Sequence, residues 1–175
     1  MSTAPPAAVS QKQWFLDAYE REHQTTMRVL RAYPKDKLDL QPHPTLRTAR
    51  DLAWIFVIER YLSIRIFNDE YRDAQPGQNG GPPPAPESWD ELLNTLDRVH
   101  KDFGDLIRST PDGEMQRKVK FFTAPKTMSE RPRLDWCWFV LHDQIHHRGQ
   151  FSVYSRIAGG KVPSIYGPSA DEPWF

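Results

Sequence analysis

The chain has 175 residues, a length that fits one compact domain with a hydrophobic core of useful size. Its 23 basic residues balance its 23 acidic residues, which excludes the strongly basic surface typical of nucleic-acid-binding and membrane-surface proteins. A single cysteine, Cys137, excludes both an intramolecular disulfide and a cysteine-based metal cluster. Because the sequence has neither a bilayer-length apolar run nor a secretory signal, we expect a cytoplasmic protein.

The N-terminal part predicts a short lead-in followed by a helix. Residues 1–10 are small and proline-rich, so we expect them to be disordered and the single domain to cover residues 11–175. From Gln11 onward, residues that can share one helical face recur at spacings of three and four. They are Leu16, Tyr19, His23, Met27 and Leu30. Pro34 ends this first helix because it cannot donate the next backbone hydrogen bond.

A second helix is predicted over residues 46–71, with Thr45 or Thr48 as its N-cap. It is apolar on nearly all sides between Leu52 and Leu62, which is typical of a central helix in a bundle. Residues 74–87 then form a proline- and glycine-rich linker. Its length suggests a crossover between distant helix ends or a mobile flap over a site.

The third helix begins at a capping box in which Ser88 and Glu91 satisfy each other's backbone amides, and it ends near Pro111. Alternating polar and apolar residues within 115–123 predict a short strand or an extended arm. Two prolines bracket residues 125–132, which we expect to form a loop.

The fourth helix is predicted from Arg133 to Ala158, and Gly159 and Gly160 stop it. The tail over residues 161–175 is rich in turn formers but carries large apolar side chains, so we expect it to pack on the bundle or on a partner. The predicted fold class is therefore all-α. It is a four-helix bundle with a long proline- and glycine-rich linker between the second and third helices and an irregular C-terminal tail.

The fourth helix carries the most informative polar residues. At 100° per residue, Asp143 and His147 fall in the middle of its apolar side, Gln150 lies next to them, and Arg148 and Gln144 point away. Two side chains one turn apart can converge on one ion. Because an unpaired buried carboxylate costs several kcal/mol, we expect an ion, a protonated histidine or an arginine beside Asp143.

Other histidines could complete a metal site. His23 and His100 lie halfway along the first and third helices and face inward, and two or three imidazoles with a carboxylate suit zinc, iron(II) or nickel. Taken singly, an inward histidine is more often a hydrogen-bonded core residue. For Asp143 and His147 on the fourth helix, the alternative to a metal site is an internal salt bridge. His142 and His146 are more typical of flank or interface residues.

With these residues identified, a family resemblance can be stated. The segment HDQIHHRGQFSVYSRIAGGKVPSIYGPSADEPW resembles the C-terminal signature of the DinB/YfiT-like family. The resemblance implies a four-helix bundle, often homodimeric, with a divalent metal bound between helices in many members, and it implies no nucleic-acid binding. Members of the wider superfamily include thiol S-transferases and an isomerase that uses low-molecular-weight thiols.

The resemblance also implies a ligand set. The family ligand just before the RG dipeptide corresponds to His147, and the ligand four residues earlier corresponds to Asp143. The family's histidine from the second helix, expected around residues 54–56, is missing here. We hypothesise that His23 fills this gap, with His146 as the next candidate.

Two functions follow as expectations. In the first, the chain is a metal-dependent enzyme, hydrolase-like or thiol S-transferase-like, with a weak or degenerate zinc, nickel or iron site that activates water or a thiol. Asp143 and His147 would hold the ion and Gln150 would orient the substrate. In the second, the chain is a non-catalytic dimeric bundle, a stress-response or binding protein that binds no metal and whose buried polar layer is structural.

Overall fold

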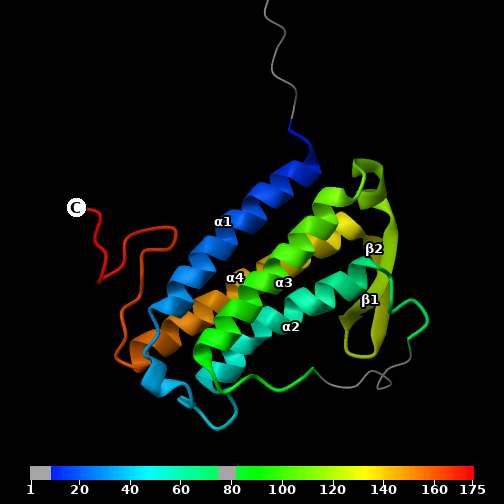
Figure 1. Cartoon of the computed structure of the whole chain (residues 1–175). Coiled ribbons are helices and arrows are strands. Elements are labelled where there is room, and N and C mark those ends of the chain that lie inside the picture. Colours follow the sequence, from blue (N-terminus) through cyan, green and yellow to red (C-terminus); the bar gives the residue numbers. More distant parts are fainter. Residues whose placement is uncertain (1–8, 75–81) are drawn as a thin grey trace, which may run out of the picture.

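Four long helices form the body of the structure (Figure 1). The computed structural model describes residues 9–74 and 82–175. The helices are α1 (Gln11–Arg31), α2 (Ala49–Phe67), α3 (Trp89–Ser109) and α4 (Arg133–Ile157), with short 3-10 turns at Lys35–Lys37 and Asp112–Gln116. The predicted four-helix bundle is confirmed, and a small β-hairpin is added to it.

Serine and threonine caps fix where three of the helices begin. The side-chain hydroxyls of Ser10, Thr48 and Ser88 each accept a hydrogen bond from the backbone N–H three residues later. Of the two candidate caps for α2, the structure therefore uses Thr48. The predicted span of 46–71 was too long at both ends, because residues on either side of α2 form turns.

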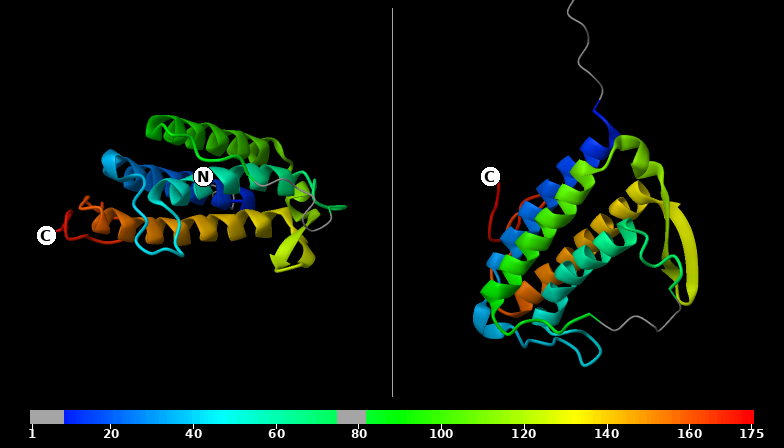
Figure 2. Two further views of the ribbon diagram at one scale, coloured as in Figure 1. Left: turned by 90° about the horizontal axis from the view of Figure 1, so that it is seen from below. Right: turned by 45° about the vertical axis from the view of Figure 1, so that its right-hand side comes forward.

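The order of the helices around the bundle determines which side chains can meet. α1 packs against α3 and α4, and α2 packs against the same two helices. Helices α1 and α2 therefore lie diagonally opposite each other, as do α3 and α4 (Figure 2). A side chain of α2 can consequently share an interface with α4 or α3.

A layer of buried polar side chains divides the core. One apolar cluster contains the C-terminal part of α1 and the N-terminal parts of α2 and α3, and a second contains the opposite ends of these helices. Between them along the helices lie buried polar residues from all four helices. These are Glu22, His23, Thr26, Glu59, Arg60, Ser63, His100, Gln144 and Arg148.

The hairpin joins α3 to α4. Strand β1 (Lys118–Ala124) pairs antiparallel with β2 (Thr127–Pro132), and Phe121 faces Ser129 in the register. The predicted strand is confirmed, but the loop expected over 125–132 is wrong. The residues of β2 are mostly polar and do not alternate with apolar ones, so their sequence does not indicate a strand. The strand forms by pairing with β1. Lys126, with a φ of 58°, provides the tight reversal between the two strands.

The C-terminal tail packs back on the bundle, as predicted, and lies on the side of α1 away from the hairpin (Figure 1). Ile165 contacts the first apolar cluster, and the Tyr166 hydroxyl donates a hydrogen bond to Glu22 Oε2 (2.6 Å). Residues 1–8 of the predicted lead-in and residues 75–81 of the predicted linker lie outside the described residues. Within the described ranges, no helix is long and apolar enough to cross a membrane.

Candidate metal centre

Three ligand-type side chains meet where α2 packs against α4. His147 Nε2 lies 3.2 Å from Glu59 Oε1 and 3.8 Å from Asp143 Oδ1. One ligand atom from each of the three residues lies within 4.8 Å of the other two. Across residues 9–74 and 82–175, no other group of three histidine, cysteine or acidic side chains is so arranged. We call Glu59, Asp143 and His147 the triad.

Local sequence explains how the triad assembles. Glu59 and Arg60 are the only charged residues between Leu52 and Leu62, so the helix that buries this stretch buries them too. Asp143 and His147 are one helical turn apart on α4 and therefore point in nearly the same direction. The Glu59 side chain is 10% exposed, whereas that of Asp143 is 45% exposed, so the triad runs from the core to the surface.

Burial makes the triad electrostatically unusual. Loss of water around Glu59 raises the pKa of its carboxyl to about 7, an effect that its hydrogen bond with His147 only partly offsets. The same hydrogen bond raises the pKa of His147. Glu59 Oε2 is fully buried and has no hydrogen-bond partner. A cation between the three side chains would offset the desolvation cost of the Glu59 carboxylate. It would also give the unpaired Glu59 oxygen a partner.

The donor set fits a divalent transition metal. Bonds of 2.0–2.2 Å in tetrahedral geometry place ligand atoms about 3.4 Å apart. The separations of 3.2 and 3.8 Å from His147 Nε2 are close to that value. Three protein ligands leave further positions for water or substrate, as in catalytic sites. An imidazole with two carboxylates suits zinc or iron(II), and the second carboxylate extends the range toward manganese.

The sequence matches the family model described as the DinB superfamily over residues 18–151. The chain belongs to the DinB superfamily. It is 25% identical, over 159 residues, to the uncharacterized protein YrdA of Bacillus subtilis, covering 90% of this chain and 89% of YrdA.

Solved structures of two bacterial proteins share the fold. A DinB-like protein of Bacillus cereus superposes with a TM-score of 0.72 at 22% identity, covering 87% of this chain and 95% of the other. YfiT of Bacillus subtilis superposes with a TM-score of 0.60 at 16% identity, covering 91% and 95%. YfiT is described as a probable metal-dependent hydrolase with an unusual four-helix bundle topology.

This superfamily member takes its third candidate ligand from α2, but as a carboxylate. The sequence hypothesis looked for a substitute on α1 or α4 and missed Glu59, which is three residues beyond the stretch 54–56. A signal was present, because a glutamate within the mostly apolar stretch from Leu52 to Leu62 has to find a buried partner.

His23, the hypothesised substitute, lies in another part of the bundle. It contacts α3, with its Nε2 2.7 Å from Asp97 Oδ1 and its ring stacked 3.7 Å from that of His100. Its Nδ1 accepts a hydrogen bond from Arg60 Nη2 (3.3 Å). Burial lowers the pKa of His23 to about 4 and that of His100 to about 3. The structure therefore places His23 with Asp97 and Arg60 rather than in the triad.

His146 and Gln150 lie beside the triad. Gln150 Oε1 is 3.2 Å from His147 Nδ1, the ring nitrogen that faces away from Glu59. Gln150 Nε2 is 3.0 Å from His146 Nε2. The structure thus brings Asp143, His147, Gln150 and His146 together along one exposed edge of α4.

The predicted orientation of α4 is wrong in one respect. Arg148, expected to point away from the core, is 1% exposed, and its Nη2 lies 2.7 Å from Glu22 Oε2. Phe139 and Ile157, which the same projection at 100° per residue puts on the predicted inward side, are 49% and 55% exposed. Because apolar side chains occur all around α4, they do not define its buried face. Asp143 and His147 therefore lie at the border of that face instead of its centre.

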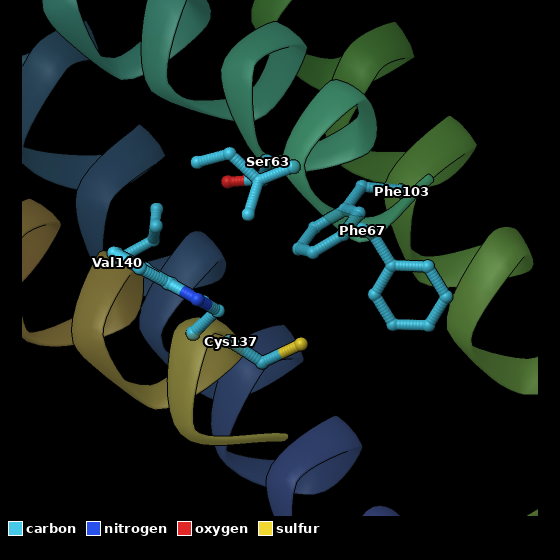
Figure 3. Close-up of a pocket in the computed structure, with 7 residues that line it drawn as sticks. Ser63, Phe67, Phe103, Cys137 and Val140 are labelled. Carbon is cyan, nitrogen blue, oxygen red and sulfur yellow. The ribbon is translucent and has the colours of Figure 1, made fainter. Parts of the chain in front are cut away.

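Cys137 lies in the core and borders a cavity of about 10 Å³. Figure 3 shows Ser63, Phe103, Cys137 and Val140 around this space. The cavity is barely the size of one water molecule and its accessible lining is apolar, which does not suit a substrate. Burial raises the pKa of the Cys137 thiol, so the residue stays a neutral core side chain and not a nucleophile.

Proposed function

We propose that the protein is a divalent-metal-dependent enzyme in which Glu59, Asp143 and His147 hold the ion. The convergence of these three side chains from two helices, with a buried carboxylate oxygen left unpartnered, is the observation that carries the proposal. The description of the structural relative YfiT as a probable metal-dependent hydrolase supports the same chemistry.

When bound, a zinc, nickel or iron ion would act as a Lewis acid and lower the pKa of water or a low-molecular-weight thiol. The chain's own residues have separate tasks. Glu59 supplies a negative charge from a water-excluded position, which strengthens its attraction for a cation. Asp143 is half-exposed and keeps one side of the triad open to an incoming molecule.

The substrate class follows from this arrangement. An ion at the border between core and solvent can be reached by a small molecule, so we propose hydrolysis or thiol transfer on a small-molecule substrate. We further propose that the protein is a homodimer. The exposed apolar residues Val153 and Ile157, neighbours one turn apart on α4, support a second copy as the partner, because they would lose their contact with water.

Metal analysis tests the proposal directly. Protein purified without chelators, then stripped and reloaded with zinc, nickel, iron(II) or manganese, should bind one ion per chain and melt at a higher temperature. Asp143→Asn and His147→Asn should abolish both effects. The matched controls Asp135→Asn and His142→Asn change the same residue types at exposed positions of α4 and should leave binding intact. Absence of stoichiometric binding by any of these ions would contradict the proposal.

A non-catalytic bundle is the alternative, and one observation favours it. Much of the buried polar layer is paired without any ion, as in the contact of Arg148 with Glu22 and that of His23 with Asp97. Under this alternative, protonation of Glu59 or of His147 would satisfy the triad, and no ion would raise the melting temperature.

A further inference from the structure

We propose that Gln150 is a positioning residue for His147 and makes no required contact with the substrate. It would hold the imidazole ring so that Nε2 faces Glu59 and Asp143 while the ring proton stays on Nδ1. The inference rests on the proposed function, because it concerns the same metal centre. Its first support is the distance of 3.2 Å between Gln150 Oε1 and His147 Nδ1.

The two ring nitrogens of His147 have different neighbours. Nε2 faces the carboxylate oxygens of Glu59 and Asp143, and Nδ1 faces the amide oxygen of Gln150. A neutral imidazole carries one proton, and only the nitrogen without it can bind a cation. An amide oxygen can only accept, so Gln150 favours the form with the proton on Nδ1. With an ion bound, that form directs the Nε2 lone pair at the centre of the triad, whereas without an ion the hydrogen bond with Glu59 occupies Nε2.

We assign His146 the tautomer with its ring proton on Nδ1, and in this form it fixes which way the Gln150 amide points. The amide nitrogen lies 3.0 Å from His146 Nε2, where it can donate a hydrogen bond to the ring. A reversed amide would place its NH₂ group against His147 Nδ1. The proton of His147 would then move to Nε2, and the lone pair would be lost to the metal. The chain of contacts from His146 through Gln150 to His147 therefore selects the ligand-competent form.

This assignment gives His146 and Gln150 roles different from those expected from the sequence. His146, a candidate ligand there, becomes the residue that orients the amide. Gln150, a candidate substrate contact there, uses both ends of its amide on neighbours within one turn of α4. Outer partners of metal-bound histidines commonly have this effect, and their loss weakens metal binding 10- to 100-fold.

Competition titration with zinc and a chromophoric chelator measures the effect. We expect Gln150→Leu to bind zinc roughly 10- to 100-fold more weakly than the unmodified protein. Gln150→Glu keeps an oxygen at the same position and should bind zinc at least as tightly as the unmodified protein. Gln13→Leu is the matched control, since Gln13 is also exposed on a helix and bonds a neighbouring side chain, and it should change nothing.

A spectroscopic readout separates positioning from general stability. In the cobalt(II)-loaded protein, the Nδ1 proton of a bound histidine gives a strongly shifted resonance that disappears in D₂O. We expect this signal to be visible in the unmodified protein and in Gln150→Glu. In Gln150→Leu it should be broadened by faster exchange with solvent. His146→Ala should weaken zinc binding, but by less than Gln150→Leu. Its control, His142→Ala, should leave zinc binding unchanged.

The outcomes distinguish this inference from the function on which it rests. If the unmodified protein binds no metal, both fail. If it binds zinc and Gln150→Leu binds equally well, the positioning role is wrong while the metal site stands. Failure of Gln150→Glu to restore affinity would also overturn it, because the acceptor oxygen would then be irrelevant.

Discussion

Replacing Glu59 by glutamine should stabilise the metal-free protein and destabilise the metal-loaded protein relative to the unmodified chain. Burial raises the folded-state pKa of Glu59 from 4.5 to about 7. The folded protein therefore holds a proton that the unfolded chain releases, and the free energy of unfolding falls as the pH rises through this window. At 1.36 kcal/mol per pKa unit, the penalty above pH 7 approaches about 3 kcal/mol.

Glutamine mimics the protonated glutamate and escapes this penalty. At pH 8 in chelator, Glu59→Gln should therefore melt roughly 6–12 °C above the unmodified protein, at about 2–4 °C per kcal/mol for a domain of this size. At pH 4.5 the difference should nearly vanish. Zinc at 1,000 times its dissociation constant stabilises the unmodified protein by about 4 kcal/mol. The variant lacks a ligand and should gain far less, so the order of the two melting temperatures reverses with zinc.

Thermal denaturation at both pH values, with chelator and with zinc, measures all four differences. Glu87→Gln makes the same chemical change at an exposed position and should stay within about 0.5 kcal/mol of the unmodified protein in every condition. A metal-free Glu59→Gln that is less stable at pH 8, or an equal response of both proteins to zinc, would refute the reasoning.

Three further predictions concern the rest of the buried polar layer and the core. The folded-state pKa values of His23 and His100 lie below 6.5, so each should remove up to about 1.4 kcal/mol of stability per pH unit as the pH falls from 6.5 toward 4. Chemical denaturation across this pH range measures the effect. A His100→Asn variant whose free energy of unfolding falls with pH as steeply as that of the unmodified protein would contradict this. Arg148→Met leaves Glu22 buried without its cation and should cost about 3–5 kcal/mol in chemical denaturation. The same change in a Glu22→Leu background should cost much less. If the stability costs of the two substitutions simply added, the result would count against the ion pair. Cys137 should react with a thiol reagent only as fast as the chain unfolds, so rapid labelling of the native protein would show that its burial is incomplete.

Helix positions could be predicted because local rules determine them. The caps at Ser88 and at the start of α2, the proline at position 34 and the paired glycines after α4 act within a few residues of chain. Strand β2 could not be predicted, because its residues become a strand only by pairing with β1. Pairing of this kind leaves little trace in a short polar segment.

The candidate site was only partly predictable, because some of its contacts are local in the chain and others depend on how the helices pack. The spacing of Asp143 and His147 is local, and it appears directly in the sequence. The contribution of Glu59 depends on α2 packing against α4 while α1 lies diagonally opposite, a matter of topology that spacing does not encode. His23 faces inward as predicted, yet it contacts α3, because an inward direction does not specify which neighbouring helix is met.

Anomalous X-ray scattering from a zinc-soaked crystal tests the proposed metal site most directly. The account predicts a single strong peak bonded at about 2.0–2.2 Å to Glu59, Asp143 and His147 Nε2. A crystal with no peak between α2 and α4, or with zinc held instead by His23 or His146, would contradict it.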